Sequence, residues 1–95
     1  MIIERAIQSR HLLAFTYDGF VRTVEPHTVG IDSKGHRALR AYQVSGGSES
    51  GEYVGWKIFH VDEIFSLSEL PQAFNGPRPG FKRGDSAFRV ITAEL

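Results

Sequence analysis

Apolar residues near the N-terminus recur at a helical spacing, and the period then changes to two. Four of them share one face of a helix predicted over residues 1–10: Ile2, Ile3, Ala6 and Ile7. From residue 12 the pattern alternates, and Asp18-Gly19 is a strong two-residue signal for a hairpin turn. Turn residues then divide the rest of the chain into predicted strands at residues 12–17, 20–31, 36–44, 54–61, 64–70 and 88–93.

A short helix followed by five or six short antiparallel strands predicts a mainly β fold and favours a small barrel, because closure removes exposed strand edges. At 95 residues the chain is long enough for one such domain. Residues 12–70 would form the barrel core. Residues 71–95, rich in Gly, Pro and basic residues, would make an excursion and the last strand.

The first hairpin sets the register of its strands. A two-residue turn at Asp18-Gly19 pairs Phe15 with Arg22 and places Val24 on the same, inward side. Further along, the pattern requires Val29 to face inward. The inward-facing positions must therefore change from even-numbered to odd-numbered residues between 24 and 29. We expect a β-bulge at Glu25-Pro26, where proline cannot donate to the ladder.

This register turns Arg22 and His27 inward, on either side of the bulge. With Tyr17 beside it, Arg22 could grip a phosphate or carboxylate group. The structural alternative is equally well supported: Arg22 would form an internal ion pair with Glu25 or Asp62, since inward charges need partners.

Composition limits the classes of function. The chain is 41% hydrophobic and 23% charged, which predicts a soluble globular domain, and no N-terminal apolar run suggests export, so we expect a cytoplasmic protein. Cysteine is absent, which excludes thiolate chemistry and disulfides. The net charge is zero, yet residues 78–95 carry an excess of two positive charges, so a polyanion would contact this tail.

The basic tail also contains aromatic residues. Phe81-Lys82-Arg83, with Arg78, has the composition used for single-stranded nucleic acid, where rings stack on bases and cations meet phosphates. The alternative for Phe74 and Phe81 is a flap that covers the core, and we favour it slightly for these two side chains.

Catalytic and metal-binding patterns are weak. The pairs Glu25/His27 and His60/Asp62 could supply metal ligands, but satisfied polar side chains at a barrel mouth are the better interpretation, so we expect no metal site. No G-x-S-x-G elbow is present, and Gly46-Gly47-Ser48 lacks the lysine and helix of a phosphate cradle. We therefore expect neither an enzyme nor a cofactor.

The order of several segments resembles the WYL-domain family over roughly residues 3–70. After the helix come LLAFTYDG, RTVEP, GHRALRAY and FHVDEI, and the later GPRPGFKRGDSA is similar to a segment of small stand-alone members. The resemblance implies an SH3-like or Sm-like barrel that senses a ligand in bacterial regulators, with nucleotides or nucleic acid as suspected ligands. Where the family has Trp-Tyr-Leu this chain has Arg37-Ala38-Leu39, and His60 and Glu63 stand where arginines are common.

The residues and the resemblance together predict a non-enzymatic binding module for a nucleotide or single-stranded nucleic acid, which acts with a partner protein because no helix-turn-helix precedes the first strand. The alternative is a structural barrel that binds itself or another protein through its strand edges. The expected ligand-binding residues are Tyr17, Arg22, His27, Arg37, Arg40, His60, Lys82 and Arg83.

Overall fold

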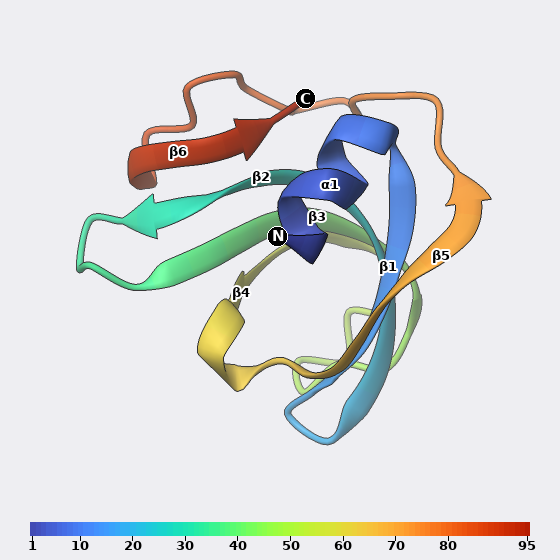
Figure 1. The fold of residues 1–95 in the computed structure, drawn as a ribbon. Coiled ribbons are helices and arrows are strands. Elements are labelled where there is room, and N and C mark those ends of the chain that lie inside the picture. The colour runs from blue at the N-terminus through green and yellow to red at the C-terminus, as the bar shows by residue number, and fades with distance from the viewer.

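Six antiparallel strands and one short helix make up the fold, which the computed structural model describes over residues 1–95 (Figure 1). In chain order the elements are α1 (Ile2–Ser9), β1 (His11–Tyr17), β2 (Phe20–Asp32), β3 (Arg37–Gly46), β4 (Gly55–His60), the 3-10 turn η1 (Val61–Glu63), β5 (Phe65–Ala73) and β6 (Phe88–Glu94). The predicted mainly β class and the helix are confirmed. β5 ends at Ala73 rather than at residue 70, because a strand paired on one side only tolerates Pro71.

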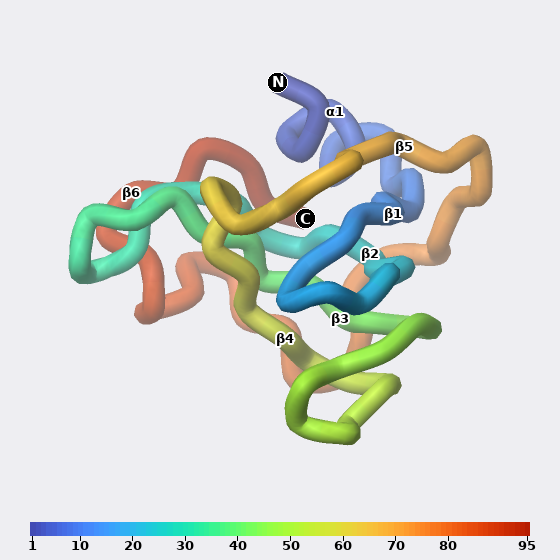
Figure 2. The backbone as a smooth tube through the Cα atoms, turned by 90° about the horizontal axis from the view of Figure 1, so that it is seen from below, coloured from blue at the N-terminus to red at the C-terminus, as the bar shows by residue number.

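The long strand β2 is the centre of the sheet. β3 pairs with it along one edge, while β1 and β6 share the other: β1 pairs with residues 20–24 and β6 with residues 28–32. The order β4-β3-β2-β1-β5 leaves β4 and β5 at the ends of the path, connected through η1. The helix α1 lies at one end of the molecule, and the loop between β3 and β4 projects at the opposite end (Figure 2).

The predicted hairpin register is confirmed: Phe15 pairs with Arg22, and Tyr17 pairs with Phe20. The predicted bulge is also present. Pro26 pairs with Ala41, and the next paired residue is Thr28, opposite Arg40. The extra residue lies where β2 passes from β1 to β6, so the bulge bends the strand at the change of neighbour.

The hydrophobic core lies between α1 and the bent sheet. Ile3, Ala6 and Ile7 on α1 are fully buried, as the helical spacing predicted, and they belong to the same cluster as Leu13 and Phe59. Burial of each large side chain stabilises the fold by about 1.5–3 kcal/mol. Arg10, whose backbone adopts the left-handed conformation, ends the helix and leads the chain directly into β1.

Residues 74–87, called the 74–87 segment below, cross the outer face of the sheet between β5 and β6. Several side-chain contacts hold this segment. Among them, Arg78 makes two hydrogen bonds to Glu25 in β2, at 2.7 and 2.9 Å, and the indole N–H of Trp56 in β4 donates to the carbonyl of Pro79 at 3.0 Å. The predicted excursion is therefore fastened to the sheet at defined points.

Candidate functional site

Arg22 is buried, as predicted, but neither predicted carboxylate contacts it. Its side chain is 3% exposed, and its guanidinium donates to the Gln43 side-chain oxygen at 3.3 Å and to the Tyr17 carbonyl at 3.1 Å. The predicted ion pair with Glu25 is wrong, because adjacent residues of a strand face opposite sides and Glu25 follows the inward Val24. Glu25 pairs with the 74–87 segment instead.

Aromatic rings surround the Arg22 guanidinium. Its central carbon lies 5.6 Å from the ring centres of Tyr17 and Phe59 and 5.7 Å from that of Phe20, within range of cation–π attraction. Its Nε has no hydrogen-bond partner. The predicted anion site around Arg22 is thus an enclosed structural position, since a ligand has no access to a side chain so deeply buried.

Tyr17 also has a structural contact. Its hydroxyl oxygen accepts a hydrogen bond from the backbone N–H of His60 at 3.1 Å, which links β1 to the end of β4. Burial raises the pKa of Tyr17 above its usual value. The hydroxyl therefore stays neutral and is already engaged within the protein.

His27 lies apart from Arg22, under the 74–87 segment. Its Nδ1–H donates to the Glu25 carbonyl at 2.8 Å, and its Nε2 accepts the backbone N–H of Arg78 at 3.1 Å. Its ring packs against Trp56, at 4.6 Å between centres, and also against Phe74 and Phe81. Burial lowers the pKa of His27, so the neutral ring is favoured. The expected joint site of Arg22 and His27 does not form.

Two of the predicted cationic ligands are paired within the protein. Arg37 makes a bidentate ion pair with Glu4 of α1, at 2.9 and 3.0 Å. This contact and further hydrogen bonds outweigh the opposing effect of burial and hold the pKa of Glu4 at about 2. Arg83 pairs with Glu94 of β6 at 3.2 Å. These contacts fasten α1 and β6 to their surroundings, and a ligand would have to compete with Glu4 for Arg37 and with Glu94 for the more exposed Arg83.

The 74–87 segment and the outer face of β3 and β4 enclose a cavity of about 260 Å³. Its lining combines two aromatic rings, two cations, one acid and two small residues: Trp56, Phe81, Arg40, Lys82, Asp85, Gly80 and Ser86. We call it the Trp56 cavity. It contains two predicted site residues, Arg40 and Lys82. Trp56 was missed, although a single tryptophan in an otherwise alternating strand was a usable signal.

The charges in the Trp56 cavity leave a small positive excess. Arg40 pairs with Asp85 at 3.0 Å, while Lys82 is exposed and forms no ion pair. Burial opposes ionisation of Asp85, but the N–H of Ala87 and the Arg40 guanidinium outweigh it and lower the pKa of this carboxyl. Two cations and one ionised carboxylate suit an anionic ligand of low charge.

A second cavity, of about 480 Å³, lies beside the Glu25–Arg78 ion pair. Its lining includes Phe74, Asn75 and Pro77, and its two charged groups neutralise each other. It offers a ligand neither a free charge nor a stacking pair of rings, so it is the weaker candidate.

The four side chains weighed as metal ligands in the sequence lie in two separate places. Glu25 and His27 are occupied by contacts to Arg78 of the 74–87 segment, in agreement with the structural interpretation of these side chains. His60 lies instead near Asp32 and His36, two residues that the sequence reasoning did not connect with it. The alternative set of Glu25, His27, His60 and Asp62 does not come together.

No known family model, no curated protein and no solved structure matches this chain. None of its helices combines the length and the apolar character that crossing a bilayer requires. The geometry of the Trp56 cavity is accordingly the basis for an assignment of function.

Proposed function

We propose that this protein is a non-enzymatic binding module for a nucleotide or a short stretch of single-stranded nucleic acid. The observation that carries the proposal is the Trp56 cavity, in which Trp56 and Phe81 lie beside Arg40 and Lys82. Rings that stack on bases, next to cations that meet phosphates, are the two elements of sequence-tolerant recognition of single strands.

Each group in the cavity has a defined task in this proposal. A base stacks on the exposed part of Trp56 or Phe81, which contributes about 1–3 kcal/mol per base. Lys82 meets the phosphate, because it has no competing carboxylate partner. Arg40 adds a second contact only when the phosphate displaces Asp85, which keeps the affinity modest.

The resemblance of the sequence to WYL domains supports the same proposal. The 74–87 segment, which crosses the outer face of the sheet, would hold the ligand against Trp56. The segment that lines the cavity also contacts Glu25 and His27 in the sheet. Through these contacts, a ligand in the cavity would affect the sheet and so a partner protein bound to the module.

The test is a titration with oligothymidylate and with AMP, monitored by the fluorescence of Trp56, the single tryptophan. EDTA in every sample keeps metal ions out of the experiment. We expect dissociation constants in the micromolar range or weaker. For oligothymidylate with two phosphate contacts, the logarithm of the association constant should fall with the logarithm of the salt concentration with a slope of about −1.4. Lys82→Glu should flatten the slope by about 0.7 or more.

Lys34→Glu is the matched control, because Lys34 is an exposed lysine in the turn between β2 and β3 and does not line the cavity. Its salt slope should match that of the unmodified protein. Equal effects of the two substitutions, or no binding at low salt, would reject the nucleic-acid proposal.

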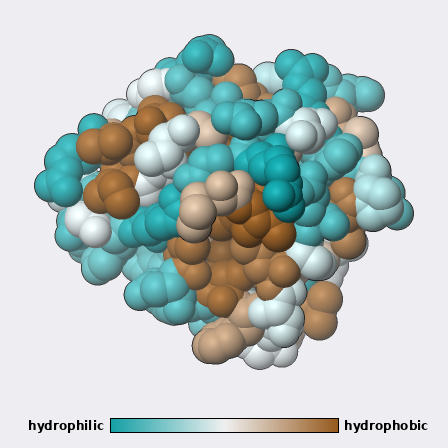
Figure 3. All heavy atoms as spheres, viewed as in Figure 1, coloured by the Kyte–Doolittle hydropathy of each residue, from teal (hydrophilic) through white to brown (hydrophobic).

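A second candidate function is self-association. The face that carries α1 shows a hydrophobic patch among polar surface (Figure 3), and at one end of the sheet β5 pairs on one side only and carries Phe65 with 66% of its surface exposed. An unpaired edge next to apolar surface is a template for a second copy of the chain. A mass that rises with protein concentration, without any response to oligonucleotide, would support this candidate.

A further inference from the structure

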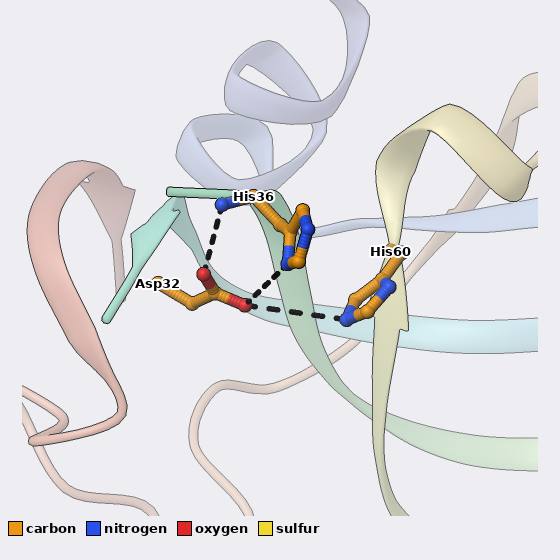
Figure 4. Close-up of side chains that lie close together, drawn as sticks. All are labelled: Asp32, His36 and His60. Atoms are coloured by element: carbon orange, nitrogen blue, oxygen red, sulfur yellow. Dashed lines mark hydrogen bonds and ion pairs between the residues drawn. The ribbon is translucent and has the colours of Figure 1, made fainter. Parts of the chain in front are cut away.

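Three side chains with metal-binding atoms meet where β2, β3 and β4 lie next to one another (Figure 4). Asp32 is the last residue of β2, His36 immediately precedes β3, and His60 is the last residue of β4. The Asp32 Oδ2 atom lies 3.7 Å from His36 Nδ1 and 4.0 Å from His60 Nε2. All three ligand atoms lie within 4.8 Å of one another.

The backbone holds the Asp32 carboxylate in this position. Its Oδ1 accepts the backbone N–H groups of Lys34 and His36, at 3.0 and 2.8 Å, and so fixes the turn between β2 and β3. Its Oδ2 receives no hydrogen bond and points at the two imidazole rings (Figure 4). One carboxylate oxygen thus organises the turn, while the other remains free to bind a cation.

Glu63 orients His60 from behind. The Glu63 Oε2 atom lies 3.2 Å from His60 Nδ1. Because a carboxylate oxygen only accepts hydrogen bonds, this nitrogen carries the proton and its N–H donates a hydrogen bond to Glu63. The lone pair is then on Nε2, which faces Asp32. A carboxylate that fixes the tautomer of a histidine in this way is the usual outer contact of a metal-binding imidazole.

We propose that Asp32, His36 and His60 form a zinc site, with Glu63 as its outer partner. The point that is equally far from the three atoms in their common plane lies about 2.5 Å from each at separations of 3.7, 4.0 and 4.8 Å, whereas zinc takes nitrogen and oxygen ligands at about 2.0–2.2 Å. Small side-chain rotations close that difference. Two nitrogen ligands and one oxygen suit zinc, and three protein ligands leave one position open to water or to an anion.

The zinc site is separate from the Trp56 cavity. Along β4, Trp56 and His60 are four residues apart, or about 13 Å. None of the three proposed zinc ligands lines the cavity. The proposal therefore stands or falls independently of nucleotide binding.

The experiment is calorimetric titration of chelator-treated protein with zinc chloride, with magnesium chloride as the comparison ion. We expect one zinc per chain and no binding of magnesium, which prefers oxygen ligands. His36→Gln and His60→Gln should each weaken zinc binding by at least about tenfold, and Glu63→Gln by about tenfold. Asp32→Asn should do the same while its remaining oxygen still caps the turn, so the circular dichroism spectrum should be unchanged.

His11→Gln is the matched control, because His11 is also partly exposed and contacts a carboxylate, Glu69, at 2.6 Å, but no third ligand lies beside it. This variant should bind zinc as the unmodified protein does. Nitrogen-15 spectra of the imidazoles should show zinc-dependent shifts at His36 Nδ1 and His60 Nε2. Equal losses in the His11 and His60 variants, or shifts at His11 instead, would overturn the proposal.

Discussion

Acidification below pH 6.5 should destabilise the contact between His27 and the 74–87 segment. The imidazole is fully buried, and its Nε2 accepts the backbone N–H of Arg78 at 3.1 Å. Protonation would turn Nε2 into a donor that faces the N–H donor of Arg78. It would also place a positive charge among the rings of Trp56, Phe74 and Phe81. The neutral ring is therefore the form that fits this position.

The sign and the size of the effect follow from proton linkage. Burial lowers the pKa of His27 in the folded protein below its usual 6.5, so the unfolded chain binds the proton first as the pH falls. The free energy of unfolding then decreases by up to about 1.4 kcal/mol per pH unit from pH 6.5 down to the folded-state pKa. Carboxylates such as Glu4 and Asp85, whose pKa values are also lowered, stabilise the folded state at neutral pH, and this stabilisation is lost only below about pH 4.5.

Urea titrations at pH 7.5, 6.5 and 5.5 measure this effect in the window that belongs to His27. Fluorescence of Trp56 reports the local contact, and far-ultraviolet circular dichroism reports the sheet. In His27→Gln, which stays neutral at every pH, the dependence between pH 6.5 and 5.5 should largely disappear. A free energy of unfolding that is constant over this range, or one that falls equally in both proteins, would refute the argument.

Two further substitutions, one of them with a matched control, test the contacts of Arg22 and of the Trp56 cavity. Arg22→Met should change the free energy of unfolding in urea by less than about 2 kcal/mol, because loss of two hydrogen bonds is offset by removal of a buried charge without a carboxylate partner; a loss above about 4 kcal/mol would contradict this. Gly80→Ala should weaken AMP binding, since φ is +93° and the new Cβ would lie 3.2 Å from the Trp56 indole nitrogen. Gly84→Ala, with φ +66° and open space around it, should show only the backbone strain, so equal AMP affinities in the two variants would argue against the Trp56 contact.

Much of the sheet could be predicted because its signals are local. The Asp18-Gly19 turn determines the register of β1 on β2, and the change of phase between Val24 and Val29 leaves a bulge near Pro26 as the simple solution. Each of these inferences compares residues a few positions apart. Geometry at this range follows from strand alternation alone.

The sites depend on contacts between distant residues, and strand alternation says nothing about those. Glu25 meets Arg78, which is 53 positions further along the chain, and no local pattern connects these two residues. His36 and His60 meet because Ala38 pairs with His60, a register that is set across the long loop between β3 and β4. The Trp56 cavity exists only once the 74–87 segment has folded over β4.

The division of one β2 edge between β1 and β6 has a consequence during translation. The β1–β2 hairpin closes through a two-residue turn and forms early, whereas the partner of residues 28–32 is synthesised about sixty residues later. Until residues 88–94 leave the ribosome, that half of β2 is an open strand edge in a nascent chain whose other strands are complete. The last strand of this sheet to be made therefore protects its centre, and slow synthesis of this stretch prolongs the time in which neighbouring nascent chains can pair through it.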